Sequence, residues 1–191
     1  MIQVIDTYIK TLNQHGYTEL RKRLCPAYLA LAQAPYLLTQ YTCLSVIEFT
    51  NSALDLNPKK ALNAAHLAAS GPVYAATTLA LGILGLISPS AALKTAEKVK
   101  TYLNRFDSIG PPKFPEYVAF QGWKERIRAP IYGFSISPYF IMRGIYLILH
   151  APLFKEWEDV QKALWNKGKT DINNGLKAPC HGIYALLYPN S

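Results

Sequence analysis

The stretch Ala61–Leu93, ALNAAHLAASGPVYAATTLALGILGLISPSAAL, is the longest run without a charged residue in this chain of 191 residues. As one helix it would span about 50 Å, well beyond the hydrocarbon core of a bilayer at about 30 Å. Gly71-Pro72 predicts a break in it, and Ser88-Pro89 predicts its end. The most apolar piece, Val73–Ile87, is then shorter than the roughly twenty residues of one crossing. The run therefore predicts either a hairpin inserted into a membrane or the central helix pair of a soluble bundle.

Basic residues lie on both sides of this run. Lys59 and Lys60 precede it, and Lys94 and Lys98 follow it. Positive charge on both flanks is expected when both ends of an inserted segment stay in the cytoplasm. The flanks therefore favour the membrane interpretation, in which these lysines contact anionic lipid head groups.

A second apolar stretch, Ala129–Phe154, contains a single charged residue, Arg143. A charge at mid-depth in a bilayer costs several kcal/mol, so we expect Arg143 to pair, to face protein or to reach towards the head groups. Arg126 and Arg128 precede this stretch and Lys155 follows it. The residues predicted to contact a membrane or another anionic surface are Lys59, Lys60, Lys94, Lys98, Arg126, Arg128, Arg143, Lys155 and Trp157.

Helix signals dominate the rest of the chain. Asn57-Pro58, Ser88-Pro89 and Ser137-Pro138 each place a capping side chain before a proline, as at the start of a helix. Apolar residues keep helical spacing over Leu93–Phe106 and over Leu153–Leu164. We therefore expect a mainly α single-domain multi-helix bundle of short, proline-delimited helices over residues 1–191. The amphipathic helix 153–165 is expected to serve as an interaction surface.

Three further segments complete this organisation. Ile2, Ile5, Ile9 and Leu12 share one helical face and predict a first amphipathic helix. The uncharged segment Leu24–Ile47, interrupted by Pro26 and Pro35, suits a buried helix better than a membrane span. Residues 109–115 (IGPPKFP) predict an internal linker, and residues 167–179 (KGKTDINNGLKAP) predict a loop.

Composition separates this chain from several protein classes. Half of its residues are hydrophobic and 17% are charged, against about 25% in an average soluble protein. Such a chain has too much apolar surface to stay disordered. The 20 Lys and Arg against 12 Asp and Glu give a net charge of +8, which favours an anionic partner. Tyr and Trp, which suit a membrane–water boundary, make up 16 of the 23 aromatic residues (13 Tyr and 3 Trp, beside 7 Phe).

The cysteines and the N-terminus indicate the compartment. Three cysteines, an odd number, in a chain long enough for its own core predict no disulfide framework and hence a reducing compartment. No basic run followed by an apolar stretch opens the chain, so we expect no secretory signal peptide. The sequence predicts the cytoplasmic face of a membrane, with a soluble cytoplasmic protein as the alternative.

The residues that commonly carry catalysis show no recognised pattern. Residues 163–170 resemble a phosphate-binding loop, but an amphipathic helix precedes them where a buried strand is needed. No nucleophile elbow, zinc-protease helix or Cys-x-x-Cys is present. We therefore expect no enzyme activity, no cofactor and no metal site. The remaining enzymatic hypothesis is a small hydrolase or transferase that uses Cys25 or Cys180.

Partners follow from the same patterns. Basic residues come in twos and threes, without zinc-finger spacing or an RNA-recognition motif, so nucleic acid is a disfavoured partner. We expect a membrane-associated interaction or scaffold protein, anchored by residues 61–93 and 129–154. The alternative is a soluble helical module that binds an acidic protein, lipid or nucleic acid. The sequence carries no signal for an oligomeric state.

Overall fold

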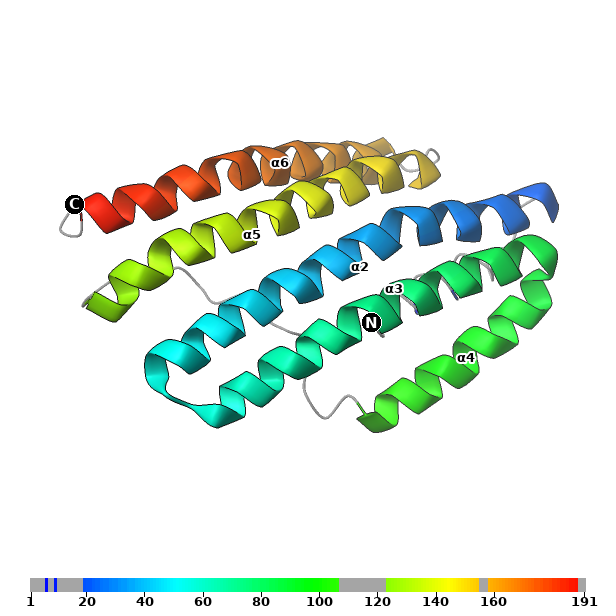
Figure 1. The fold of residues 1–191 in the computed structure, drawn as a ribbon. Coiled ribbons are helices and arrows are strands. Elements are labelled where there is room, and N and C mark those ends of the chain that lie inside the picture. Colours follow the sequence, from blue (N-terminus) through cyan, green and yellow to red (C-terminus); the bar gives the residue numbers. More distant parts are fainter. Residues whose placement is uncertain (1–5, 7–8, 10–18, 107–122, 155–157, 189–191) are drawn as a thin grey trace. The chain divides into compact units, whose positions relative to one another are not determined.

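The computed structural model describes residues 6, 9, 19–106, 123–154 and 158–188. These residues form α2 (Glu19–Asp55), α3 (Pro58–Ile87), α4 (Pro89–Phe106), α5 (Trp123–His150), the 3-10 helix η1 (Ala151–Phe154) and α6 (Glu158–Leu187), as Figure 1 shows. No strand occurs in this part of the chain. The prediction of a mainly α multi-helix bundle is confirmed.

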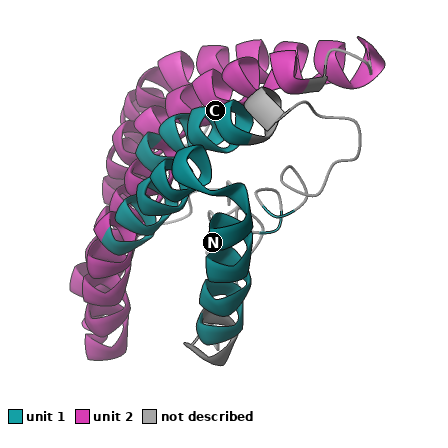
Figure 2. Cartoon of the chain, turned by 90° about the vertical axis from the view of Figure 1, so that its right-hand side faces the viewer, with its two compact units in different colours: residues 1–35, 73–113 teal, residues 36–72, 114–191 magenta. Residues whose placement is uncertain are grey.

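The chain divides into two compact units (Figure 2). Unit 1 contains Met1–Pro35 and Val73–Lys113, and unit 2 contains Tyr36–Pro72 and Phe114–Ser191. Both units are discontinuous in sequence, because α2 and α3 each run through both of them. A single domain over residues 1–191 stays a prediction, and the predicted linker 109–115 lies outside the described residues.

Two of the three predicted helix starts are confirmed. Helix α3 begins at Pro58, and the Asn57 side-chain oxygen accepts a hydrogen bond from the Lys59 amide at 3.0 Å. Helix α4 begins at Pro89, and the Ser88 hydroxyl accepts a weaker one from the Ala91 amide at 3.4 Å. Side chains at these positions satisfy backbone N–H groups that have no partner within the helix.

The prolines inside helices overturn several boundaries. Helix α3 continues through Pro72, and α5 continues through Pro138, so the break at Gly71-Pro72 and the start at Ser137-Pro138 were wrong. Helix α2 likewise runs through Pro26 and Pro35, and the helices are long rather than short. A proline removes one ladder hydrogen bond, at a cost of about 3 kcal/mol. At Pro72 the helix is held by tertiary packing within unit 2: Gly71 is buried, and a Cβ on it would lie 3.0 Å from the Tyr41 Cβ.

The loop predicted for residues 167–179 was also wrong, because all of it lies inside α6. Its glycines are buried in a helix contact instead of forming turns. Of the helix predicted over 153–165, Leu153 lies in the 3-10 helix η1 and residues 158–165 lie in α6. Lys155 and Trp157 lie outside the described residues, as does the predicted first helix apart from Asp6 and Ile9.

Unit 1 has an aliphatic core between α3 and α4. Leu81, Ala92 and Ala96 are buried together, and the partly buried side chains that pack against them are Ile9, Leu84, Leu93 and Val99. The predicted core-facing stripe of residues 93, 96 and 99 is thereby confirmed. Gly82 lies so close to Ala30 of α2 that a Cβ on it would collide with the Ala30 methyl group.

Unit 2 packs the C-terminal part of α2 against α3 and contains the α5/α6 pair. Leu37, Tyr41, Leu44 and Ile47 are buried on α2. The Ser45 hydroxyl donates a hydrogen bond of 2.8 Å to the Ala64 carbonyl oxygen of α3. Helices α5 and α6 lie side by side along their lengths (Figure 1).

Candidate membrane-facing surface

Three glycines at intervals of seven residues bring α6 into backbone contact with α5. Gly168, Gly175 and Gly182 are all buried. A Cβ on Gly168 would lie 2.7 Å from the Gly144 carbonyl oxygen, and one on Gly182 would lie 2.6 Å from the Ala129 carbonyl oxygen. Since the later α6 residue meets the earlier α5 residue, the helices are antiparallel. Only glycine fits these positions without moving a backbone.

An ion pair crosses this contact. The Arg143 guanidinium of α5 donates to both carboxylate oxygens of Asp171 on α6, with Nε and Nη2 each at 2.7 Å. Its Nη1 donates to the Tyr139 hydroxyl at 3.1 Å. Asp171 is 1% exposed. The expectation that Arg143 needs a partner is met by Asp171, and a bidentate pair of this kind neutralises both charges.

Aromatic rings in unit 2 extend from this pair to α2. The rings of Tyr36 and Tyr146 stack with centroids 5.3 Å apart, and Tyr139 lies 6.0 Å from Tyr36. The Arg143 guanidinium lies over the rings of Tyr139 and Phe140, at 5.2 and 4.9 Å. The cation is therefore held by protein on several sides and does not rely on lipid or water for compensation.

Two other predicted surface cations are engaged within the chain. Lys60 pairs with Asp55 at 2.7 Å, and Arg128 pairs with Asp55 and, at 3.3 Å, with Glu125. The hydrogen bond from Lys60, together with Arg128, lowers the pKa of Asp55 below its ordinary value. These two cations therefore already have carboxylate partners.

The other predicted cations among the described residues are exposed. Lys59 lies at the start of α3, Lys94 and Lys98 lie on α4, and Arg126 lies in the first turn of α5. The lysines of α4 line a shallow depression together with Glu97, Thr101 and Tyr102. Lys94 and Lys98 of unit 1 are thereby brought together at one depression.

Helix α3 carries the apolar run from which the sequence analysis began. Among the described residues it is the one helix long and apolar enough to cross a membrane, and only 33% of its most apolar window is buried. Its exposed large side chains are Leu62, Val73, Leu79, Ile83, Leu86 and Ile87. A core helix of a soluble protein would bury most of such a surface.

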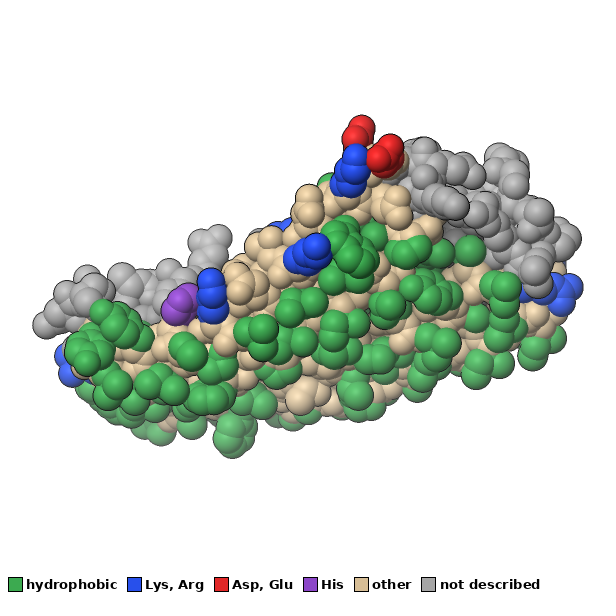
Figure 3. Space-filling model, turned by 90° about the horizontal axis from the view of Figure 1, so that it is seen from above, with side chains coloured by type: hydrophobic (Ala, Val, Ile, Leu, Met, Phe, Trp, Pro, Cys, Tyr) green, Lys and Arg blue, Asp and Glu red, His purple; other side chains and the backbone are tan. Residues whose placement is uncertain are grey.

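A further apolar surface covers the α5/α6 pair; most of its α5 part lies in the predicted segment 129–154, whereas its α6 part beyond residue 165 was missed by the sequence analysis. Figure 3 looks onto these helices and shows hydrophobic side chains gathered along them. The exposed members on α6 include Trp165, Leu176, Ile183 and Leu187, and those on α5 include Trp123, Ile127, Phe134, Ile145 and Leu149. The seven-residue glycine spacing was the sequence signal for a helix here, and the polar turn residues between the glycines concealed it.

The two candidate nucleophiles lie on different helices: Cys25 is half-buried on α2, and Cys180 is exposed on α6. Cys180 and His181 are both exposed on α6, but consecutive helical residues point about 100° apart and do not face each other. Burial raises the pKa of the Cys43 thiol to about 11, so this thiol is protonated at neutral pH. Within the described residues no group of three or more His, Cys, Asp and Glu side chains is placed to hold a metal ion.

Comparison with known proteins adds no identity to this picture. Neither the protein-family models, nor the curated proteins, nor the solved structures contain a match to this chain.

Proposed function

We propose that this protein is a non-enzymatic, membrane-associated helical protein that is anchored to the membrane by its apolar segments 61–93 and 129–154, and that it acts as an interaction or scaffold protein. The observation that carries the proposal is the exposed apolar surface of α3. Transfer of a fully exposed Leu or Ile side chain out of water gains about 1.5–3 kcal/mol. Several such side chains on one helix favour lipid strongly.

The polar side chains of α3 are compatible with lipid. The hydroxyls of Thr77 and Thr78 each donate a 2.8 Å hydrogen bond to the carbonyl oxygen four residues earlier, and Ser70 does so at 2.7 Å. Hydroxyls bonded within their own helix need no water. No charged residue lies between Lys60 and Lys94. The helix therefore offers lipid an apolar surface without unsatisfied side-chain hydroxyls at these positions.

The charge within segment 129–154 is compensated too. Arg143 is the one charged residue of this segment, and Asp171 binds it in two hydrogen bonds. A paired, hydrogen-bonded charge costs much less in a bilayer than an isolated one. This pairing supports the presence of α5 at the membrane.

Fractionation of cells that express the full chain tests the proposal. We expect the protein in the membrane fraction, retained in high salt and released by detergent. Ile83→Asp, at a 60% exposed position of α3, should shift it towards the soluble fraction. Phe49→Asp, at a 65% exposed position of α2 outside both segments, is the matched control and should not. A wholly soluble, monodisperse monomer at low salt without detergent would overturn the proposal.

A soluble helical binding module is the second candidate. It is favoured by the protein cores, since Leu29, Leu37 and Ile47 are each at most 1% exposed without any lipid. The same fractionation separates the two candidates, because a module of this kind stays in the supernatant at low salt.

A further inference from the structure

We propose that the outer face of the α5/α6 pair docks onto an anionic lipid bilayer, with α6 lying in the plane of the membrane surface. This inference rests on the proposed function and deepens it. It assigns a lipid charge class and a contact surface to α6, which lies outside the segments 61–93 and 129–154.

The outer stripe of α6 consists of Trp165, Leu176, Ile183 and Leu187. Intervals of eleven, seven and four residues place all four on one side of a helix. Gly175 and Gly182, which touch α5, each come one residue before a member of the stripe. One residue corresponds to a rotation of about 100° around the helix axis, so the stripe lies about a quarter of a turn from the α5 contact. Leu176 is 64% exposed, and Trp165, Ile183 and Leu187 are exposed as well.

Helix α5 adds a second stripe on the same side. Its exposed members Ile127, Phe134, Ile145 and Leu149 are separated by seven, eleven and four residues, which again places them on one helical side. Because the two helices are antiparallel and join through their glycine sides, both stripes open onto the same face of the pair. Figure 3 shows this face as a broad field of hydrophobic side chains. A flat bilayer surface fits a face of this kind.

The exposed lysines on α6 indicate that the surface bound by this face is anionic. The exposed cations of α6 are Lys162, Lys167, Lys169 and Lys177, of which Lys162 pairs with Glu158 at 2.8 Å and Lys167 lies 3.9 Å from Asp171. The exposed acids, Glu158 and Asp159, both lie in the first turn of the helix, and Asp171 is buried and bound by Arg143. Each lysine near an anionic membrane surface contributes about 1 kcal/mol. A cationic border around an apolar face is complementary to anionic head groups above acyl chains.

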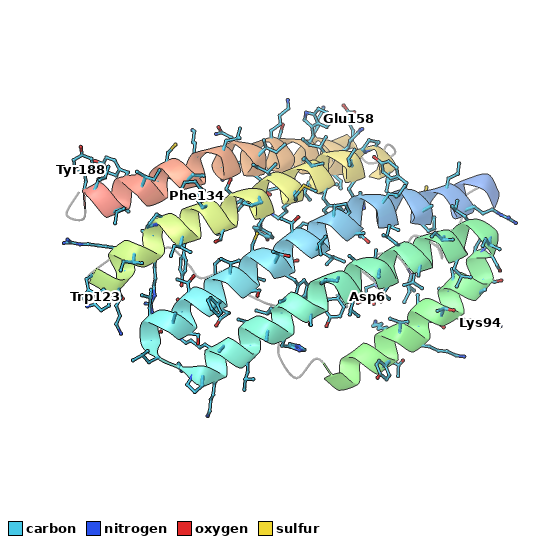
Figure 4. The ribbon with its side chains drawn as sticks, viewed as in Figure 1. Asp6, Lys94, Trp123, Phe134, Glu158 and Tyr188 are labelled. Carbon is cyan, nitrogen blue, oxygen red and sulfur yellow. The ribbon has the colours of Figure 1, made fainter. Side chains whose placement is uncertain are left out.

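Aromatic residues occur where a head-group region would lie. Lys169 Nζ is 5.4 Å from the ring centroid of Trp165, and Lys124 Nζ is 5.9 Å from that of Trp123. Trp123 and Tyr188 lie at the same end of the pair, and Glu158 lies at the other end (Figure 4). Trp and Tyr with neighbouring cations are the side chains that anchor proteins at membrane interfaces.

The polar residues of α6 determine its orientation. Asn166, Asn173, Asn174 and Lys177 are exposed away from the α5 contact. A helix crossing the hydrocarbon core would have to bury these amides and this ammonium group, whereas a helix lying in the interface leaves them in water. The amphipathic pattern therefore places α6 on the membrane surface.

Vesicle binding by the full chain tests the inference. Vesicles of phosphatidylcholine alone are compared with vesicles that also contain phosphatidylserine. The double variant Leu176→Asn/Ile183→Asn should lose about tenfold or more in partition onto the anionic vesicles. The double variant Val46→Asn/Phe49→Asn, at exposed positions of α2, is the matched control and should bind as the wild type does. Far-UV circular dichroism confirms that both variants remain helical.

Charge and position are tested separately. Lys169→Glu/Lys177→Glu should weaken binding to the anionic vesicles and leave binding to neutral vesicles unchanged. A chain with Trp165 as its single tryptophan, made by Trp123→Phe and Trp157→Phe, should shift its emission to the blue and be quenched by brominated lipid. An emission shift that follows protein concentration without lipid would mean that a second copy covers the face, and would overturn the inference.

The outcomes separate this inference from the proposed function. A wild-type chain that binds neither kind of vesicle overturns both. A wild-type chain that binds while Leu176→Asn/Ile183→Asn binds equally well overturns only the docking of α6, because segments 61–93 and 129–154 are unchanged in that variant.

Discussion

The α5/α6 pair of unit 2 and the α3/α4 core of unit 1 show two ways of bringing helices together. In the pair, glycines such as Gly168 and Gly144 allow backbones to touch, and Arg143 and Asp171 add a charge pair across the contact. In unit 1 the core is aliphatic, with Leu81 against small alanines. An aliphatic core tolerates exchange of similar volumes, whereas backbone contact and buried charge tolerate little. We therefore expect substitutions in the α5/α6 contact of unit 2 to lower the free energy of unfolding more than substitutions in the core of unit 1.

Removal of the buried cation should have the largest effect. Arg143→Met leaves Asp171 buried without its partner, and the free energy of unfolding should fall by about 3–5 kcal/mol in urea titration followed by circular dichroism. Lys162→Met is the control, because it opens the exposed pair with Glu158 and should cost at most about 0.5 kcal/mol. Equal losses in the two variants would contradict a special role for the buried pair.

Glycine substitution sharpens the contrast between the units. Gly168→Ala should cost about 1–3 kcal/mol, because its Cβ would meet the Gly144 carbonyl oxygen of the α5 backbone. Gly82→Ala meets a side-chain methyl of Ala30 instead, so the exchange Gly82→Ala/Ala30→Gly should restore the stability of unit 1. Thermal unfolding of these variants measures both effects. Failure of the exchange would show that the contact at Gly82 also depends on backbone geometry.

The helix caps allow a smaller comparison. Asn57→Ala should destabilise by about 1 kcal/mol, because the Lys59 amide loses its acceptor. Ser88→Ala should cost less, since the hydrogen bond from the Ala91 amide is longer, at 3.4 Å. Chemical denaturation of the two variants under one set of conditions gives the order, and a larger loss for Ser88→Ala would contradict it.

The smallest effect is a pH dependence at Asp55. Its pKa is lowered in the folded chain by Lys60 and Arg128, so the stabilisation is fully present above the unfolded value of about 3.9 and is lost as the pH falls through the folded value. The stability difference between the wild type and Asp55→Asn should therefore be constant near neutral pH and shrink in acid. A difference that persists unchanged into strong acid would exclude this origin.

Local sequence signals predicted part of the fold. The caps at Asn57 and Ser88 and the stripe in α4 follow from interactions within a few residues, and they are confirmed. The prolines and turn residues led to wrong helix boundaries, because tertiary packing overrides their local tendency to end a helix. Gly168 and Gly175, for example, are typical of a loop in the sequence, and only the contact with the α5 backbone explains why they lie in a helix.

The candidate surface shows the same limit. Arg143 was predicted to need a partner from its cost alone, but Asp171 lies 28 residues further along the chain and inside a segment predicted as a loop. Only the antiparallel register of α5 and α6 identifies it. The outer stripe of α6 was missed for the same reason. Residues 167–179 were predicted as a loop, so their apolar side chains were not assigned to one face of a helix.

The unit boundaries have a consequence for dissecting this protein. Two of the three boundaries fall directly after Pro35 in α2 and Pro72 in α3, and the third falls after Lys113, so the chain passes from unit 1 to unit 2, back to unit 1 and again to unit 2. No single cut of the polypeptide releases either unit whole, and a truncation from either end that stops within α3 removes residues of both units. Deletion mapping will therefore report on the two units together, whereas point substitutions address them one at a time.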